Sequence, residues 1–211
     1  MSTETLLNTA PGQSSVHDRS LLRGAVAMAV LAMLGAGLLY PLAGLGIGQA
    51  LFPAAANGSL VERDGRVVGS ALVAQPFADA RYFQPRPSAS GYDVMNLAGS
   101  NQARSNPEMR QRIEAARDAV ARRDQADAEA VPSDSVTQSG GGIDPHISPA
   151  NAAMQAGRLA AARALARAQV DALVAQFTEG PQFGLLGQPR VNVLRLNLAL
   201  DRLGAGRTGV Q

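Results

Sequence analysis

The feature that most constrains this chain is an uncharged stretch near its N-terminus. Residues 24–61 contain no Asp, Glu, Lys, Arg or His, and within them Gly24–Ile47 is almost wholly apolar. A bilayer core about 30 Å thick needs roughly 20 such residues in a helix. Because lipid offers no partner for free backbone N–H and C=O groups, a single spanning segment must be helical. We therefore predict a transmembrane helix over residues 21–47.

The flanks of this span predict its orientation. Arg19 and Arg23 stand just before it, whereas the first basic residues after it are Arg63 and Arg66. By the positive-inside rule, the N-terminal tail then lies in the cytoplasm and the rest of the chain outside it. A cleaved signal peptide is the alternative, since Ala54–Ala56 resembles a cleavage site, but the apolar region of a signal peptide is much shorter. The length favours a retained single-pass anchor.

Composition limits what can follow the span. About 150 residues remain, enough for one domain with a modest core. The net charge of +2 gives no reason to expect nucleic acid as a partner. The chain has no cysteine, which excludes disulfides and thiolate chemistry, and its two histidines are too few for a histidine metal cluster. We expect no catalytic residue and no metal site.

The expected fold class is α+β, with one N-terminal transmembrane helix followed by a single mixed α/β domain outside the cytoplasm. The predicted parts are a cytoplasmic tail over residues 1–20, the transmembrane helix over 21–47, an extracytoplasmic domain over 48–203 and a disordered tail over 204–211.

Local patterns place the regular elements of the domain. They predict a strand over Val67–Gln75 with a bulge at Gly69, a helix over Pro107–Asp124, a helix over Pro149–Phe177, and a short strand passing into a helix over Val191–Leu203. Both central helices begin with proline after a capping residue, Asn106 or Ser148. Gly157 can interrupt the second, which would give two shorter helices.

Two segments are candidates for contact with partner proteins. The span carries small residues four positions apart, which let another helix approach closely, although such residues are common in any transmembrane helix. In the domain, the Pro-rich segment 81–93 is interpreted either as an exposed recognition loop or as an aromatic plug at the edge of the core. The candidate contact residues are Ala32, Ala36, Gly44 and Gly48 in the span, and Tyr82, Phe83, Arg86 and Ser88 in the domain.

The Gly-rich segment Ser133–Ser148 has several interpretations. It could cradle a phosphate, but the pattern GxxxxGK[ST] is absent and the chain has no lysine. Asp144 and His146 could be two metal ligands, or two members of a hydrolase triad, yet nothing else in the sequence completes either site. A tight structural turn leading into the capped helix is the interpretation that we favour.

Seven segments occur in an order that is typical of one family. They are YPLAGLGIGQALFP (Tyr40–Pro53), NGSL (Asn57–Leu60), GSALVAQPF (Gly69–Phe77), YFQPRPSA (Tyr82–Ala89), SNP (Ser105–Pro107), SGGGIDPHISP (Ser139–Pro149) and PRVNVLRLNLALD (Pro189–Asp201). Together they resemble the C subunit of the Kdp potassium-transporting P-type ATPase. The resemblance covers about residues 20–203.

The chain departs from this family pattern at three places. Gly157 stands where the family usually has proline, and Ala164 stands where it usually has glycine. The segment Gln102–Arg104 replaces a Leu-Gly-Pro sequence. The first two departures leave the position of the break between the two helices open.

The resemblance implies a non-catalytic accessory subunit of an ATP-driven potassium uptake complex in the bacterial inner membrane. Its partners would be a channel-like potassium-translocating subunit, an ATP-hydrolysing subunit, a small single-span subunit and the lipid bilayer. It would assemble and stabilise the complex, which uses ATP, Mg and potassium, and would itself bind no cofactor. The alternative is a catalytic chaperone that raises the ATP affinity of the hydrolysing subunit, with nucleotide contacts at Gln138, Ser139, Gly140, Gly141 and Gly142.

Overall fold

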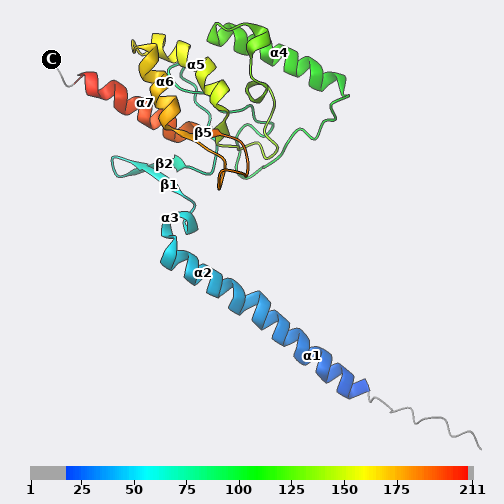
Figure 1. Ribbon diagram of the computed structural model, residues 1–211. Helices are drawn as coiled ribbons and strands as arrows, with labels where there is room; N and C mark the ends of the chain where they lie inside the picture. Colours follow the sequence, from blue (N-terminus) through cyan, green and yellow to red (C-terminus); the bar gives the residue numbers. More distant parts are fainter. Residues whose placement is uncertain (1–17, 209–211) are drawn as a thin grey trace, which may run out of the picture. The chain divides into compact units, whose positions relative to one another are not determined.

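The computed structural model describes residues 18–208, so most of the predicted N-terminal tail lies outside the described residues. The chain divides into two compact units, residues 1–56 and residues 57–211. The structure therefore has mixed helices and small sheets, with one long helix in the first unit and everything else in the second (Figure 1).

The first unit is one nearly continuous helix. It comprises α1 (Asp18–Leu34), a π-helical turn η1 (Gly35–Leu39), α2 (Tyr40–Leu51) and a short α3 (Pro53–Ala56). Residues Ser20–Leu51 form a helix that is long and apolar enough to cross a membrane, with a mean hydropathy of 2.0 over an 18-residue window. The helix runs past the predicted end at Ile47 to Leu51. It stops there because Phe52 precedes Pro53 and leaves the helical conformation, with φ −136° and ψ 54°.

Pro41 changes the winding of this helix without ending it. A proline in a helix has no N–H to donate, and its ring clashes with the carbonyl four residues earlier, here that of Gly37. The turn just before it is π-helical, and the N–H of Tyr40 bonds to the carbonyl of Gly35 five residues back. The wider turn relieves the clash, and the helix continues through Pro41 as α2.

The second unit begins with a β-hairpin. Strand β1 (Leu60–Arg63) pairs antiparallel with β2 (Arg66–Ser70). The prediction of one strand over Val67–Gln75 was therefore wrong in extent, because the chain leaves the hairpin after Ser70. The turn residues Asp64 and Gly65 both have positive φ, 52° and 73°, which is the backbone that an Asp-Gly hairpin turn requires.

The bulge in this hairpin lies beside Gly69, as predicted. Val61 pairs with Gly69 but Glu62 pairs with Val67, which leaves Val68 as the extra residue. A side chain at Gly69 would overlap Gln75, whose amide nitrogen donates to the carbonyl of Val68 at 3.2 Å. The absence of a side chain at Gly69 thus leaves room for Gln75, whose hydrogen bond connects the following loop to the bulge.

Three helices and a small sheet form the core of the domain. The sheet has the antiparallel order β3 (His146–Ile147), β5 (Arg190–Asn192), β4 (Thr178–Glu179). Against it pack α5 (Pro149–Ala162), α6 (Arg167–Gln176) and α7 (Val193–Thr208) (Figure 1). The buried apolar cluster consists of Phe83, Ile147, Ala152, Ala156, Leu159, Ala160, Leu165, Val170, Val174, Val191, Val193, Leu196 and Leu200.

The helix starts were predicted correctly, and the structure places the break in the second helical segment, whose position the sequence left open. Helix α4 spans Pro107–Asp124 with the Asn106 side chain accepting from Glu108 N–H, and two 3₁₀ turns follow it, η2 (Ala128–Ala130) and η3 (Ser133–Ser135). Gly157 lies inside the uninterrupted helix α5. The chain breaks at Ala164 instead, which has φ 52°.

The end of α5 is a Schellman motif. The N–H of Leu165 bonds to the carbonyl of Ala160 at 2.9 Å, and that of Ala164 bonds to the carbonyl of Ala161 at 3.3 Å. This motif needs a left-handed residue at Ala164, a position where glycine costs least. Helix α6 then begins at Arg167.

The C-terminal segment switches from strand to helix, as predicted. Asn192 ends β5, and its side-chain oxygen accepts from the N–H of Arg195 at 3.1 Å, which caps α7. Helix α7 continues to Thr208, past Leu203, so the tail that was expected to be disordered from residue 204 is largely helical. Residues 209–211 lie outside the described part of the chain.

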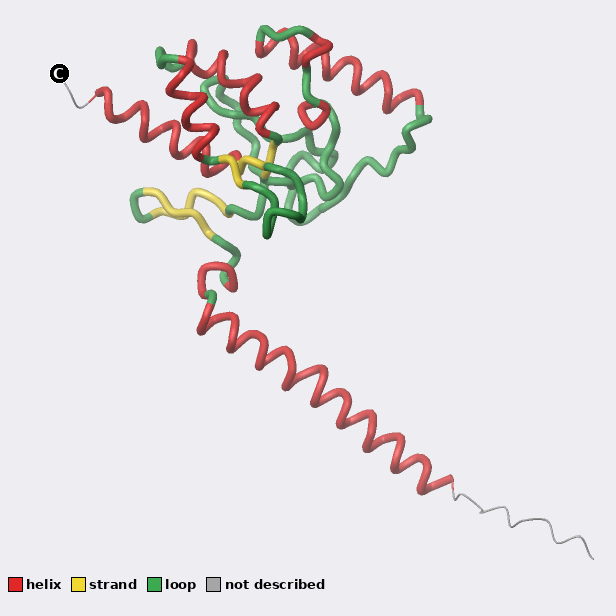
Figure 2. The backbone as a smooth tube through the Cα atoms, in the orientation of Figure 1, coloured by secondary structure: helices red, strands yellow, loops and turns green. Residues whose placement is uncertain are grey.

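A long irregular segment, residues 71–106, crosses the domain between β2 and α4 (Figure 2). Its backbone lacks a strand partner at Phe83 and Gln84, and amide side chains take that place. Asn197 of α7 exchanges two hydrogen bonds with the backbone of Phe83, at 2.8 and 3.0 Å. Gln155 of α5 does the same for Gln84, at 2.8 and 3.1 Å. These buried amides fix an irregular segment as a sheet neighbour would.

Candidate functional site

The segment 81–93 and the Gly-rich segment pack together into one loop cluster, centred on Arg86. A nitrogen of its guanidinium lies 3.0 Å from Oδ2 of Asp144, and a second faces the carbonyls of Thr137 and Gln138 at 3.5 Å. The hydroxyl of Tyr92 donates to the carbonyl of Arg86 at 2.9 Å. Arg86 therefore holds the two segments together and is only partly accessible.

The electrostatics of Asp144 favour its ionised form. Burial raises the pKa of Asp144, but hydrogen bonds from the side chain and backbone N–H of His146, together with the charge and hydrogen bond of Arg86, outweigh burial. The pKa of Asp144 consequently lies below its ordinary value. The carboxylate acts as an ionised tie between Arg86 and His146.

The three consecutive glycines have different environments. Gly142 has φ 76°, and a side chain there would lie 2.4 Å from Oγ of Ser90 and 2.9 Å from the carbonyl of Ala98. A side chain at Gly140 or Gly141 would meet no atom within 4 Å. Only Gly142 is thus required by the local packing.

Little of this segment is available to a nucleotide. Ser139 is 3% exposed, and its N–H bonds to the carbonyl of Pro87 at 3.1 Å. The side-chain oxygen of Gln138 is also buried, without a hydrogen-bond partner among the described residues. Of the five positions with an expected nucleotide contact, Gly140 and Gly141 are the exposed ones. These contacts agree with the interpretation of the segment as a structural turn.

A cavity of about 390 Å³ lies beside this cluster, lined by Arg86, Asp134, Asp144, His146, Ile147, Ser148, Gln188, Pro189 and Arg190. Its two carboxylates, those of Asp134 and Asp144, already accept hydrogen bonds from neighbouring residues. Asp134 accepts from the backbone N–H and hydroxyl of Ser148 and from the amide of Asn151, at 2.8 to 3.0 Å. Within residues 18–208, no group of three or more His, Asp or Glu side chains is arranged to hold a metal ion.

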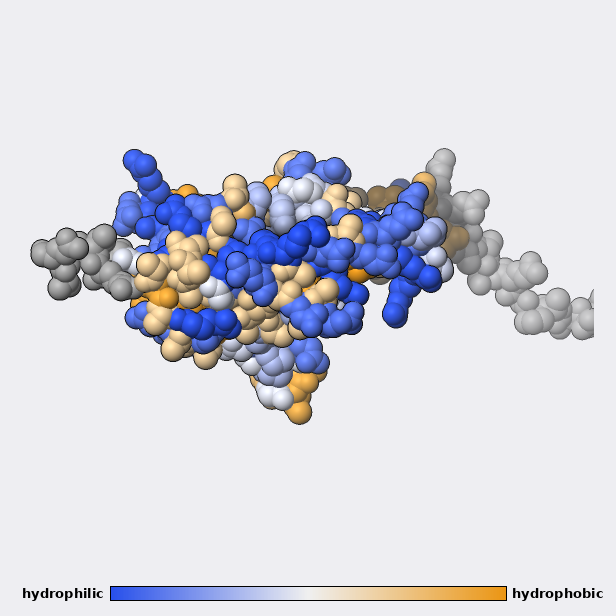
Figure 3. Space-filling view, turned by 90° about the horizontal axis from the view of Figure 1, so that it is seen from above, coloured by the Kyte–Doolittle hydropathy of each residue, from blue (hydrophilic) through white to orange (hydrophobic). Residues whose placement is uncertain are grey.

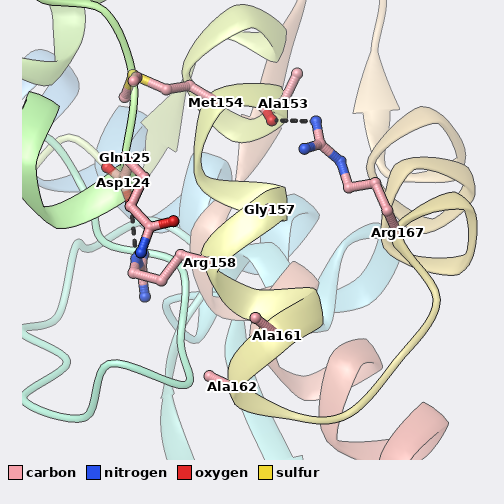
Figure 4. A pocket seen from close by; sticks show the side chains of 10 residues that line it. Asp124, Gln125, Ala153, Met154, Gly157, Arg158, Ala161, Ala162 and Arg167 are labelled. Carbon is pink, nitrogen blue, oxygen red and sulfur yellow. Dashed lines mark hydrogen bonds and ion pairs between the residues drawn. The ribbon is translucent and has the colours of Figure 1, made fainter.

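A larger cavity, of about 680 Å³, lies between the end of α4 and the outer face of α5. Figure 4 shows Asp124 beside Arg158, and Arg167 reaching from α6 to the carbonyl of Ala153 past Gly157. The Asp124 side chain is fully buried, and Oδ1 lies 2.6 Å from Nε of Arg158. The nitrogens of Arg158 also donate to the carbonyls of Ala80 and Tyr82. The charged side chains that line this cavity therefore connect α4, α5, α6 and the irregular segment 71–106 to one another.

The remaining candidate contact residues of the domain are mostly internal. Phe83 is fully buried, so it belongs to the core and presents no surface to a partner. Tyr82 stacks with the guanidinium of Arg163, 4.7 Å from its ring centre, and donates to Asp201. The hydroxyl of Ser88 accepts from the N–H of Tyr92 at 2.9 Å. The aromatic-plug interpretation thus describes Phe83, and segment 81–93 is a part of the packed domain.

The small residues of the span lie on the exposed helix surface, apart from the half-buried Gly48. In a regular α-helix, Ala32 and Gly48 would point about 160° apart. The π turn between them adds one residue to a turn, which reduces this angle to about 60°. The π turn therefore brings Ala32, Gly44 and Gly48 toward one face of the helix.

One exposed feature was missed by the sequence analysis. Phe183, Leu185 and Leu186 are 86%, 86% and 61% exposed, in the loop between β4 and β5. The signal was available, because FGLLG is an apolar run between Pro and Gly residues.

Fold and site define a class of protein: a small mixed helix-and-sheet domain carried by one long apolar helix, with its buried charges used to fasten loops. Comparison with known proteins makes this specific. Residues 22–202 match the family model described as KdpC: K+-transporting ATPase, c chain.

Curated relatives agree with this match. The chain is 60% identical over 194 residues to the potassium-transporting ATPase KdpC subunit of Xanthomonas oryzae pv. oryzae, covering 92% of this chain and 93% of the relative. The KdpC subunits of Methylococcus capsulatus and Gemmatimonas aurantiaca are 52% and 51% identical, covering 79% and 90% of this chain and 90% and 96% of the relatives.

The chain belongs to the KdpC family, and the resemblance seen in the sequence is confirmed. It is a non-catalytic subunit of the potassium-transporting ATPase complex, and other subunits of that complex are its partners.

Proposed function

We propose that the chain is a single-pass inner-membrane subunit that assembles and stabilises the complex from outside the cytoplasm. The helix packs against a span of the potassium-translocating subunit, and the domain docks on the outer face of that subunit. These two contacts stabilise the association of the potassium-translocating subunit with the ATP-hydrolysing subunit. The observation that carries this proposal is the long apolar helix, whose small residues share one face.

The orientation follows from the distribution of charge. Arg23 precedes the apolar run, and the next basic residue is Arg63. This asymmetry favours a cytoplasmic N-terminus. The Gly-rich segment then lies outside, away from cytoplasmic ATP. An influence on the ATP affinity of the hydrolysing subunit would be indirect, through coupling across the complex.

Labelling in intact cells tests the orientation. The chain has no cysteine, so single cysteines can be placed at Ser14, at Met95, which is 89% exposed, and at Gly140. Reaction with a membrane-impermeant maleimide at 95 and 140, but not at 14, supports the proposal. Reaction at 14 alone would reverse the orientation and make direct contact of the Gly-rich segment with ATP the leading function.

Substitution in the span tests the packing. Gly44→Leu puts a large side chain on the face that we propose for helix contact, whereas Gly46→Leu puts it about 200° around the helix. Neither glycine has a neighbouring atom within 4 Å of an added side chain. We expect G44L to reduce copurification of the potassium-translocating subunit and G46L to leave it unchanged. Equal behaviour of the two variants would reject this face as the contact.

A further inference from the structure

The loop between β4 and β5, residues 180–189, carries an apolar tip formed by Phe183, Leu185 and Leu186. The segment GPQFGLLGQP contains no charged residue, and all three side chains of the apolar tip are exposed. Figure 2 shows the loop leaving the small sheet and projecting from the domain. In the space-filling view, hydrophilic and apolar side chains are mixed over the domain, and orange atoms lie at the end of one projection (Figure 3).

The shape of the loop keeps the apolar tip away from the core. Gln182 and Leu186 exchange backbone hydrogen bonds at 2.8 and 2.9 Å, which closes the loop. Phe183, Gly184 and Gly187 have positive φ values of 56°, 74° and 85°. These turns fix the tip in a projecting conformation, so its exposure is built into the backbone.

The base of the loop is linked to the start of the domain. The amide of Asn192, at the end of β5, donates to the carbonyl of Ala71 at 2.8 Å. The N–H of Ala71 in turn bonds to the carbonyl of Ser59 at 3.0 Å. Figure 1 draws the loop and the start of β1 at the same edge of the domain.

The start of the domain is joined to the apolar helix by a short connection. The apolar helix ends at Leu51, α3 ends at Ala56, and the domain begins at Asn57. So short a connection gives the domain a high effective concentration at the surface of the bilayer in which the helix is anchored. Lipid is therefore the apolar phase that is always within reach of this edge.

The charge at the base of the loop suits a lipid headgroup layer. Glu179 lies between Arg190 at 3.2 Å and Arg195 at 3.7 Å, which leaves one net positive charge. The side chains of Arg190 and Arg195 are 41% and 52% exposed. Guanidinium groups bind phosphate through paired hydrogen bonds. An apolar tip of Phe and Leu next to basic side chains supplies both contributions to interfacial binding, namely apolar area to bury and attraction to anionic lipid.

We propose that the apolar tip inserts into the headgroup region of the bilayer that anchors the chain, and that Arg190 and Arg195 contact lipid phosphates. The inserted tip is a second attachment, which fixes how the domain is turned relative to the membrane. This inference rests on the proposed membrane anchoring and goes beyond it.

Tryptophan fluorescence tests the insertion, because the chain contains no tryptophan. Phe183→Trp would be the single reporter in the full chain, reconstituted in vesicles of phosphatidylethanolamine and phosphatidylglycerol with or without brominated acyl chains. The matched control is Met95→Trp, another highly exposed apolar residue in a loop. Leu185→Trp serves as a second reporter should Phe183→Trp disturb the fold.

Insertion predicts a blue-shifted emission and bromolipid quenching for F183W and L185W, and water-exposed, unquenched emission for M95W. Unquenched emission from F183W and L185W in a chain that floats with the vesicles would overturn the tip insertion and leave the anchoring intact. A blue shift that arises only after the other subunits are added would overturn it in favour of a protein contact. Failure of the chain to float with vesicles after alkaline washing would overturn the anchoring and the insertion together.

Discussion

Asn197 and Phe83 are separated by 114 residues, yet the Asn197 side chain accepts from the N–H of Phe83 and donates to its carbonyl. Asn197 is 1% exposed and Phe83 is fully buried, so both hydrogen bonds are shielded from water. Backbone groups in the interior need such partners, because leaving them unpaired costs free energy. The fold of the irregular segment thus depends on a side chain of the last helix.

Replacing this amide should destabilise the domain strongly. Asn197→Leu leaves a buried N–H and a buried carbonyl without partners, which we expect to lower the free energy of unfolding by about 2–4 kcal/mol. Asn96→Leu makes the same chemical change at an exposed position and should stay within about 0.5 kcal/mol of the parent. Urea unfolding of the detergent-solubilised full chain measures both. Similar unfolding midpoints for the two variants would contradict the role that we assign to Asn197.

Ala164→Gly should stabilise the chain. Ala164 has φ 52°, a left-handed conformation that is costly for residues with a Cβ and easy for glycine. After allowing for the greater freedom of glycine in the unfolded chain, the gain should be about 0.5–1 kcal/mol. Ala161→Gly, inside α5, should instead lower stability by about 1 kcal/mol. Thermal unfolding distinguishes opposite shifts, and two shifts of the same sign would count against the Schellman interpretation.

Loss of the buried carboxylate of Asp124 should cost more than loss of a surface carboxylate. Asp124→Ala leaves the Arg158 guanidinium, whose side chain is 10% exposed, without its counter-charge. Removal of one partner from such a pair typically lowers stability by about 3–5 kcal/mol. Asp171→Ala breaks the exposed pair with Arg167 and should cost about 0.3–0.5 kcal/mol. The two free energies of unfolding, measured at neutral pH, should therefore differ clearly; a small effect of D124A would show that Arg158 finds other partners.

The tie between Asp144 and Arg86 should make the domain sensitive to acid. Because the pKa of Asp144 is lower in the folded chain, its ionisation contributes stability above its ordinary value of 3.8. That contribution is lost as the pH falls through the lower, folded value. Asp144→Asn should consequently be less stable than the parent near pH 7, and the gap should narrow below about pH 3.8. Urea titrations across this range test it, and a gap independent of pH would assign the effect of D144N to packing alone.

Local signals predicted the helix starts but not how the segments meet. A capping side chain and the proline after it act within one turn, so Asn106-Pro107 and Ser148-Pro149 were sufficient. The hairpin was not predicted although Asp64-Gly65 is a turn signal, because its first strand, Leu60–Arg63, is short and contains two charged residues. The position of the break stayed open between Gly157 and Ala164, because alanine normally favours helix and nothing local shows that Ala164 takes a left-handed conformation.

The site was harder to predict than the fold. Phe83 was expected at a partner surface, since proline and arginine surround it in the sequence. Its burial depends on Gln155 and Asn197, which are distant along the chain and carry no local signal. Conversely, the run FGLLG signals an apolar loop in the sequence, but the turn geometry that keeps Phe183 out of the core cannot be read from it.

The use of helix side chains in place of a neighbouring strand also fixes an order of events during synthesis. Residues 71–106 leave the ribosome long before Asn197. The backbone N–H and C=O of Phe83 therefore stay hydrogen-bonded to water until the last helix has been synthesised. A chain truncated before α7 would lack the amide of Asn197, and Asn192 would have no helix to cap. Folding of this domain can therefore be completed only after its C-terminal helix α7 has been synthesised, long after the apolar N-terminal helix.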